Sequence, residues 1–203
     1  MTKSVLFVCT GNTCRSFMAE YLLRSHASRH NLELRVASAG LAAFTGDTGS
    51  DHAIEALQEV GINATGHRSR KVHVHLLHEF DLILPMTESH KKQLLALAPE
   101  LSGKIFLLKE FAERVNQGKD PTELVEKDYE ISDPFGQSLD VYRQSREEID
   151  QAVRAIVAYF LEGGGNVKVA VGSDHGGFGA KKALIEHLRG QGFDVHDFGT
   201  DSE

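Results

Sequence analysis

The chain has 203 residues, of which 41% are hydrophobic and 25% charged, which are the proportions of an ordinary soluble globular protein. Its formal net charge of −7 argues against nucleic acid or an anionic membrane as a partner, although it leaves room for a local anion site. No apolar run approaches the roughly 20 residues of a membrane span, and the apolar start is too short for a secretory signal. We therefore expect a cytoplasmic protein.

The predicted elements alternate between strand and helix. Apolar runs predict buried strands at "SVLFVC" (4–9), "ELRVASAG" (33–40), "FDLILPM" (80–86) and "KIFLL" (104–108). Helices are expected at about 15–30, 51–60, 88–98 and 138–161. This order predicts an α/β fold, in which a doubly wound, four-stranded parallel sheet is flanked by helices. The active crevice of such a sheet lies at the carboxyl ends of its strands, which directs attention to the loop after the first strand.

A glycine-rich break, "EGGGN", follows the last long helix. Residues 163–166 therefore predict a flexible linker after a domain that covers residues 1–162. Residues 167–203 predict a strand, a helix and a second strand, which bury too little surface to be stable alone. Such a unit would pack on the first domain, pair with another copy or begin a longer domain, and we interpret it as a β-α-β fragment of a second α/β domain.

The loop "CTGNTCRS" after the first strand has the composition of an anion cradle. Its backbone N–H groups and the helix N-terminus that follows would face the same space, and Gly11 and Asn12 tolerate the left-handed backbone that this needs. Arg15 offers a planar fork of donors for two phosphate oxygens. Cys9 would be favoured there as a thiolate, with Ser16 donating to its sulfur. The alternative interpretation is an inert cysteine at the end of a core strand.

Five segments resemble one family in the right order between residue 1 and about residue 162. They are "VCTGNTCRS", "VASAG", "GHRSR", "DLILPMTESHK" and "SDPFGQSLDVYRQSREEID", and the family is the low-molecular-weight protein tyrosine phosphatases. Within it, "CTGNTCRS" and "DPFG" are most similar to the bacterial protein arginine phosphatases. The resemblance implies a phosphatase that needs no cofactor and no metal, since the loop amides and Arg15 supply the positive field.

The resemblance also assigns roles. Cys9 would be the nucleophile that forms a phosphocysteine, Arg15 the phosphate clamp, and Asp133 the general acid that later acts as base. Without the resemblance, Asp133 reads as an ordinary turn aspartate before proline. The phosphate-binding residues would be Thr10, Gly11, Asn12, Thr13, Cys14, Arg15 and Ser16.

Three further residues match family positions that brace the loop through hydrogen bonds, namely Asn12, Ser38 and His67. Their alternative interpretation is an ordinary turn, a strand end and a loop histidine. The run "HVHLLH" at 73–78 could suggest a metal, but its histidines do not all share one helical face, which favours the start of a solvated helix.

Two side chains bear on the substrate. By resemblance, the threonine at position 13 is typical of arginine-specific relatives, whereas tyrosine-specific relatives carry a bulkier aliphatic residue there. Phe135 matches the aromatic wall of the site and could stack on a phenyl ring or a guanidinium plane. We expect phosphorylated proteins as partners, with phosphoarginine preferred over phosphotyrosine.

The loop departs from a bare phosphate cradle at two positions. Cys14, a second thiol near the nucleophile, could capture an oxidised Cys9 as a disulfide and so protect it, or it could merely pack under the loop. Phe17 stands where the family usually has proline, which suits a first helical turn, so the loop is expected to be slightly looser.

The tail resembles the amino-terminal segment of type B ribose-5-phosphate isomerase, where Asp174 and His175 match a pair in the sugar-phosphate site. That family's catalytic residue lies further downstream, so we expect a vestigial site without isomerase activity, in a portion through which the chain could oligomerise.

Three less favoured functions stay open at this point. One is an arsenate reductase, although such enzymes normally have more cysteines after the loop, and both cysteines of this chain lie within it. The second is an isomerase with a regulatory phosphatase half, and the third is an inactive phosphopeptide-binding module.

Overall fold

The computed structural model describes residues 3–117, 128–163, 168–171, 181–186 and 194–197. The chain divides into two compact units, Met1–Ala158 and Tyr159–Glu203, and each is described by itself. Among the described residues, no helix combines the length and the apolar character that crossing a bilayer requires.

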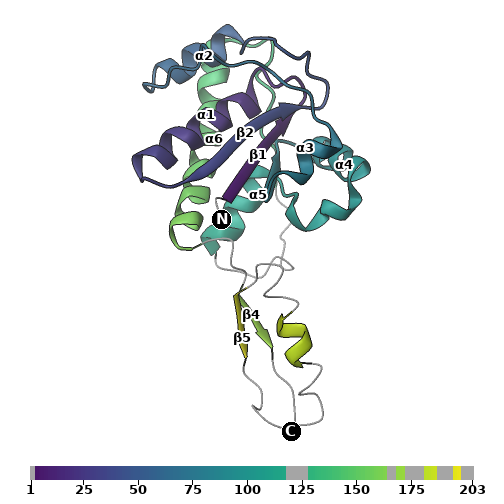
Figure 1. The fold of residues 1–203 in the computed structure, drawn as a ribbon. Helices are drawn as coiled ribbons and strands as arrows, with labels where there is room; N and C mark the ends of the chain where they lie inside the picture. The colour runs from purple at the N-terminus through teal and green to yellow at the C-terminus, as the bar shows by residue number, and fades with distance from the viewer. Residues whose placement is uncertain (1–2, 118–127, 164–167, 172–180, 187–193, 198–203) are drawn as a thin grey trace. The chain divides into compact units, whose positions relative to one another are not determined.

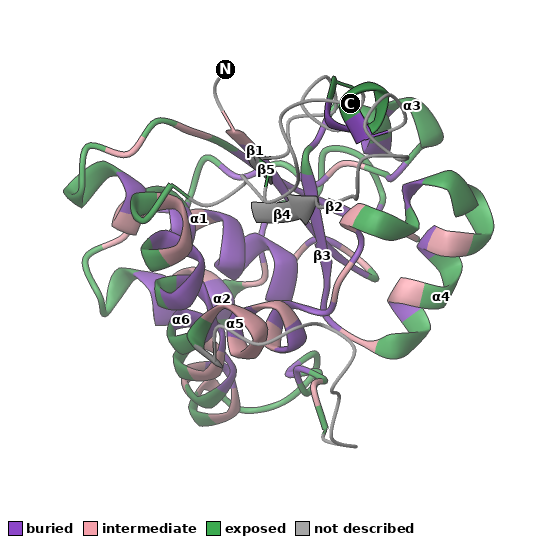
Figure 2. Ribbon diagram, turned by 90° about the horizontal axis from the view of Figure 1, so that it is seen from below, coloured by how far each residue is buried: buried purple, intermediate pink, exposed green. Residues whose placement is uncertain are grey.

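The first unit is an α/β layer structure whose helices cover both faces of a central sheet (Figure 1). The helices α1, α2, α5 and α6 lie on one side of the strands, and α3 and α4 lie on the other (Figure 2). The elements in chain order are β1 (Lys3–Cys9), α1 (Arg15–Arg29), β2 (Leu34–Gly40), α2 (Asp51–Gln58), α3 (Val74–His78), β3 (Leu82–Pro85), α4 (Glu88–Leu97), the 3-10 helix η1 (Pro99–Lys104), α5 (Leu108–Gln117) and α6 (Leu139–Leu161).

The sheet is parallel with the strand order β2-β1-β3, and β1 is paired on both sides. Successive side chains of a strand point to opposite faces. Leu6 and Val8 therefore join the core formed with α3 and α4, where they belong to one buried cluster with Leu77 and Leu94. From Ser4 to Cys9 every residue of β1 is buried, as the continuous apolar run predicts for a central parallel strand.

The predicted fourth strand is not a strand in the structure. "KIFLL" contributes only an isolated parallel bridge between Ile105 and Ile83, with one backbone hydrogen bond of 3.1 Å from Phe106 N to Ile83 O. The segment is too short for a strand because it lies between two helices. η1 extends to Lys104, and α5 already begins at Leu108. The sequence did not lead us to expect α5. The described sheet of this unit therefore has three strands rather than four.

The carboxyl ends of β1 and β2 lie side by side at the edge that carries the loop, with Cys9 opposite Gly40. Gly40 is required there because a Cβ would lie 2.5 Å from Thr10 O and 2.8 Å from Asn12 N. Backbone hydrogen bonds of 2.9 Å then join Leu41 N to Cys9 O and Ala42 N to Thr10 O. The glycine that ends "VASAG" thus lets the loop after β1 pack directly on β2.

The second unit contains two short strands, β4 (Lys168–Val171) and β5 (Asp194–Asp197), which pair in parallel. Residues 181–186 between them are helical, so the strand–helix–strand order expected for the tail is confirmed. Lys181 Nζ lies 2.7 Å from Asp197 Oδ1 and ties this helix to the end of β5. Most of the predicted linker at 163–166, and both Asp174 and His175, lie outside the described residues.

Candidate active site

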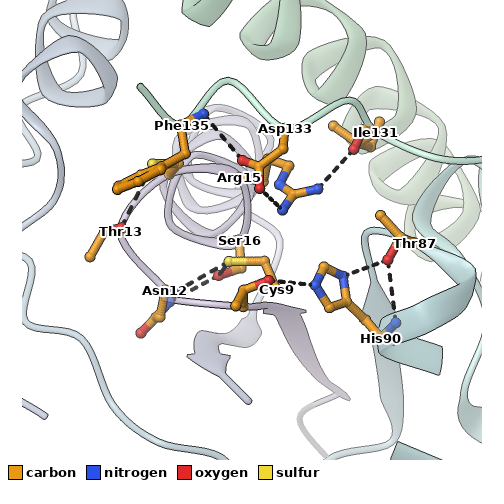
Figure 3. Close-up of polar contacts among 12 residues, drawn as sticks. Cys9, Asn12, Thr13, Arg15, Ser16, Thr87, His90, Ile131, Asp133 and Phe135 are labelled. Carbon is orange, nitrogen blue, oxygen red and sulfur yellow. Dashed lines mark hydrogen bonds and ion pairs between the residues drawn. The ribbon is translucent and has the colours of Figure 1, made fainter. Parts of the chain in front are cut away.

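Cys9 is the last residue of β1, and its sulfur lies at the bottom of the loop (Figure 3). Asn12 N donates a hydrogen bond to Cys9 Sγ at 3.3 Å, and Ser16 Oγ lies 3.0 Å from the same atom. The side chain of Cys9 is almost entirely buried, at 3% exposure. The two donors are placed where they would stabilise negative charge on the sulfur.

Arg15 begins α1 and is buried beside the loop. It donates from one terminal nitrogen to Ile131 O at 3.0 Å and from the other to Asp133 Oδ2 at 2.7 Å. Its Nε is buried without a hydrogen-bond partner among the described residues, although a guanidinium normally uses all its donors. Asp133 itself is half exposed. The structure thus brings together the three predicted catalytic residues, with Arg15 and Asp133 across from Cys9 (Figure 3).

These side chains surround a pocket of about 200 Å³. It is lined by Cys9, Thr10, Gly11, Thr13, Cys14, Arg15, Asp133 and Phe135. The start of α1 also faces this region, Cys14 at the N-cap makes no side-chain cap hydrogen bond, and the first turn of α1 holds no acidic residue. Unused N–H groups at a helix start favour binding of a phosphate-like anion.

Asn12 is the centre of the bracing network. Its φ of 59° lies in the left-handed region, as the loop composition predicted. Its side-chain amide donates to Ser38 Oγ at 2.7 Å and to Ser16 Oγ at 3.0 Å, while Oδ1 accepts from Arg70 N at 3.0 Å. These contacts fix the loop onto β2, onto the start of α1 and onto the segment that follows α2.

His67 holds the other side of the same residue. Its Nε2 donates to Asn12 O at 2.7 Å, which assigns the proton of the neutral ring to Nε2, and burial lowers the pKa of His67. Ser38, in turn, donates to Glu20, a buried carboxylate that also pairs with Arg24 at 2.6 Å. The structure therefore places Asn12, Ser38 and His67 in the positions from which they can brace the loop.

Phe17 is fully buried rather than loosely placed. Its ring stacks on that of His67, with centroids 4.3 Å apart, and meets Tyr21 edge-on at 5.2 Å. Gly49 lies directly over this ring, since a Cβ there would be 2.4 Å from Phe17 Cε1. The residue that replaces the family's proline is thus part of the packing behind the loop.

The two predicted specificity residues lie at the mouth of the pocket. Phe135 is 72% exposed, and its backbone N–H donates to Asp133 Oδ1 at 3.2 Å. Thr13 Oγ1 lies 3.7 Å from Cys14 Sγ, and its carbonyl accepts from Ser50 N at 2.9 Å. An aromatic ring and a hydroxyl therefore flank the position where a leaving group would sit (Figure 3).

Cys14 is buried and points toward α6. Its sulfur lies 3.3 Å from Tyr142 Oη and 3.5 Å from Ser50 Oγ. Burial raises the pKa of Tyr142 to about 12, and the contact with Cys14 acts in the same direction, so Tyr142 keeps its proton. Both cysteines are free thiols.

Sequence reasoning missed one histidine at the site. His90, in the first turn of α4, is buried between Thr87 and the loop (Figure 3). Its Nε2 lies 2.9 Å from Thr10 Oγ1, and its Nδ1 lies 3.0 Å from Thr87 Oγ1. The pattern Thr-x-x-His at a helix start was the available signal, but no local rule connects position 90 with position 10.

The histidines of "HVHLLH" lie around α3, as a helix start predicts. His73 is the N-cap and accepts from Leu76 N at 3.1 Å, whereas His75 and His78 pair with Glu79 and Glu100. Within the described ranges, no group of three or more His, Cys, Asp or Glu side chains is placed to hold a metal ion.

Known proteins are similar to this chain in amino-acid sequence and in fold. Residues 169–203 match the family described as "Ribose/Galactose Isomerase". The chain is 38% identical to the protein-arginine-phosphatase of Bacillus subtilis over 152 residues, which is 75% of this chain and 93% of that protein. It is 32% identical to the low molecular weight protein-tyrosine-phosphatase Wzb of Escherichia coli, over 76% of this chain and 92% of that protein.

A solved structure of the YwlE arginine phosphatase is also similar. It is a cysteine-to-serine mutant with a phosphorylated active-site serine, and it superposes with a TM-score of 0.69 at 35% identity over 78% of this chain and 96% of that one. Residues 4–164 match the family described as "Low molecular weight phosphotyrosine protein phosphatase". The chain therefore belongs to the low molecular weight protein tyrosine phosphatase family.

Proposed function

We propose that this protein hydrolyses phosphoarginine on proteins, with Cys9 as nucleophile, and that it needs no metal. The observation that carries the proposal is the pairing of the Cys9 sulfur, which accepts from Asn12 N and lies 3.0 Å from Ser16 Oγ, with the buried guanidinium of Arg15 at the same pocket. With Cys9 as a nucleophile at the bottom of the pocket and Arg15 as a planar cation at its side, the pocket suits a tetrahedral phosphoryl group.

The reaction would run in two displacements. In the first, the Cys9 thiolate attacks phosphorus, the bond from phosphorus to the guanidinium nitrogen breaks, and Asp133 delivers its proton to that nitrogen. In the second, Asp133 takes a proton from water, the water oxygen attacks phosphorus, and the sulfur–phosphorus bond breaks to release inorganic phosphate and the thiolate. Arg15 and the loop amides hold the phosphoryl oxygens throughout.

Support for a phosphorylated enzyme intermediate comes from the YwlE structure, whose active-site serine is phosphorylated. The supporting geometry in this chain is the half-exposed carboxylate of Asp133, which sits at the mouth of the pocket and pairs with Arg15 at 2.7 Å. It is reachable by a leaving group and by water. To hold the phosphoryl oxygens with its terminal nitrogens, Arg15 would exchange its contacts with Asp133 and Ile131 for them.

The choice of phosphoarginine rests on Thr13 and on the relatives. The hydroxyl of Thr13 lines the pocket and can meet a polar guanidinium, and the Bacillus subtilis relative is named a protein-arginine-phosphatase. Phosphotyrosine is the second candidate. It is favoured by the exposed ring of Phe135, which can stack on a phenyl group, and by the name of the Escherichia coli relative.

The test compares initial rates on phosphoarginine and phosphotyrosine peptides of the same sequence, with a chelator present. We expect phosphoarginine to be preferred, and Thr13→Ile to shift the ratio of the two kcat/KM values toward phosphotyrosine. Cys9→Ser is the control and should be inactive on both peptides. Equal ratios for the parent and Thr13→Ile would refute the specificity assignment, whereas activity in Cys9→Ser would refute the mechanism.

We also propose that residues 1–162 form the phosphatase domain, that 163–166 link it to the tail, and that 167–203 are an isomerase-like portion. Support comes from the separate match of residues 169–203 to an isomerase family. Oligomerisation through this portion and a cytoplasmic localisation stay predictions.

A further inference from the structure

His90 is a buried polar side chain to which the proposed mechanism assigns no role. It projects from the first turn of α4, and its ring lies between two hydroxyl groups, Thr87 Oγ1 at 3.0 Å from Nδ1 and Thr10 Oγ1 at 2.9 Å from Nε2. Thr10 belongs to the loop and lines the phosphoryl pocket beside Cys9. The histidine therefore connects the helix that follows β3 with the binding loop that follows β1 (Figure 3).

The direction of these two hydrogen bonds depends on the tautomer of His90. Thr87 Oγ1 already accepts from His90 N at 3.3 Å as the N-cap of α4, so its own hydrogen is available for His90 Nδ1. A neutral imidazole has one donor and one acceptor. If Nδ1 accepts from Thr87, Nε2 carries the proton and donates to Thr10 Oγ1. The hydroxyl hydrogen of Thr10 then remains free to donate into the pocket.

The electrostatic surroundings keep the ring neutral. Burial lowers the pKa of His90 from 6.5 to about 4, and the positive charge of Arg15 acts in the same direction. The carboxylates of Asp133 and Glu130 oppose this shift. At neutral pH His90 therefore carries one ring proton, so that one ring nitrogen donates and the other accepts.

We propose that His90 is a positioning residue that turns the Thr10 hydroxyl into a fixed hydrogen-bond donor for the phosphoryl group. The inference rests on the proposed function, because it names a further donor of the same pocket. A donor whose direction is set before the substrate arrives stabilises developing negative charge without reorganisation during the reaction. The opposite tautomer of His90 would consume the Thr10 hydrogen and would remove that donor.

The test removes the hydrogen-bonding groups of each partner. Thr10→Val replaces the hydroxyl by a methyl group, and His90→Phe keeps a ring but has no donor. For each variant, kcat and KM on a small aryl phosphate and the Kd of inorganic phosphate by calorimetry are measured. We expect both variants to lose kcat/KM by on the order of 10- to 100-fold and to bind phosphate more weakly, as is typical of a lost hydrogen bond to a charged group.

Two further variants separate positioning from general damage. Thr10→Ser keeps the hydroxyl and should lose at most about threefold, and His90→Gln, whose amide can still donate toward Thr10, should recover part of the loss of His90→Phe. The double variant of His90→Phe and Thr10→Val should be no worse than Thr10→Val alone, because His90 acts only through the Thr10 hydroxyl. Thr65→Val removes an exposed hydroxyl whose one partner within the described part of the chain is Asn63, and it serves as matched control.

The inference is overturned if His90→Phe lowers stability but leaves phosphate affinity and kcat/KM at parental values. It is equally overturned if the losses of the two single variants add up in the double variant. An inactive parent would instead defeat the proposed function. The calorimetric Kd of inorganic phosphate for the parent and Thr10→Val would still decide the role of the Thr10 donor in that case.

Discussion

Replacing Gly49 by alanine should destabilise the first unit through one aromatic side chain. The added methyl carbon would lie 2.4 Å from Cε1, 2.8 Å from Cζ and 3.0 Å from Cδ1 of Phe17. Contacts this short require atoms to move, and Phe17 has little room because it is fully buried between His67 and Tyr21. Overpacking of this kind costs about 1–3 kcal/mol. For a unit of this size, that lowers the melting temperature by roughly 2–10 °C.

The same strain should reach the active site. Phe17 stacks on His67, and His67 donates to Asn12 O, so a displaced ring would shift the residue that holds the loop. We expect kcat/KM to fall by about tenfold, because small misplacements of catalytic groups are costly. Chemical denaturation followed by circular dichroism gives the free energy of unfolding, and an aryl phosphate assay gives kcat/KM.

Two variants make this reasoning refutable. Gly103→Ala is the matched control, since no atom lies within 4 Å of its added Cβ, and it should stay near parental stability. Combining Gly49→Ala with Phe17→Leu should cost less than the sum of the two single changes, because the shorter side chain removes the clash. If Gly49→Ala unfolds at the same denaturant concentration as Gly103→Ala, the described packing of Phe17 is wrong.

Three more predictions concern the loop and its surroundings. Because the pKa of His90 falls from 6.5 to about 4 on folding, the unfolded chain binds more protons in that window. The contribution of His90 to the free energy of unfolding is complete above pH 6.5 and should be lost as the pH falls toward 4. This loss amounts to about 1–2 kcal/mol after discounting for the nearby solvent-exposed pocket. Urea titrations at several pH values should show a loss in the parent that is larger, by this amount, than the loss in His90→Gln, which still contains the buried His67. Asn12→Ala should lower the free energy of unfolding by about 2–4 kcal/mol, because its hydrogen bonds are lost. Asn12→Gly should lower it by about 1 kcal/mol less, because glycine adopts the left-handed φ of 59° without strain. Equal losses of the two variants in thermal unfolding would contradict this role of the backbone. If Cys14 captures an oxidised Cys9 under peroxide, Tyr142→Phe should change the rate of recovery with thiol, because it removes the partner of Cys14 at 3.3 Å.

Much of the site could be predicted from the sequence because its parts are close together along the chain. Cys9, Arg15 and Ser16 belong to one strand–loop–helix unit, and buried strands followed by a glycine-containing turn predict such a unit well. Asp133 came only from the resemblance to a family. No local rule distinguishes a catalytic aspartate from a turn aspartate, since the two differ only in what lies opposite them.

The fourth strand shows the limit for the fold. "KIFLL" has the apolar, branched composition of a strand, yet only Ile105 makes a bridge, because η1 and α5 leave three residues between Lys104 and Leu108. Where a helix begins and ends around so short a segment depends on packing against β3 and α4. That packing is not encoded in the composition of the five residues themselves.

The sequence by itself determined the alternation of strands and helices, the position of the binding loop at the end of the first strand and the residues that the loop carries. These depend on propensity, on periodicity and on neighbours within one turn or one strand. The resemblance to a family already indicated His67, but only the tertiary structure decided which loop residue each distant side chain contacts. His67 contacts Asn12, Tyr142 contacts Cys14 and His90 contacts Thr10. The physical reason is that a hydrogen bond across 55, 128 or 80 positions exists only once the layers have packed, and its geometry belongs to the fold rather than to either segment.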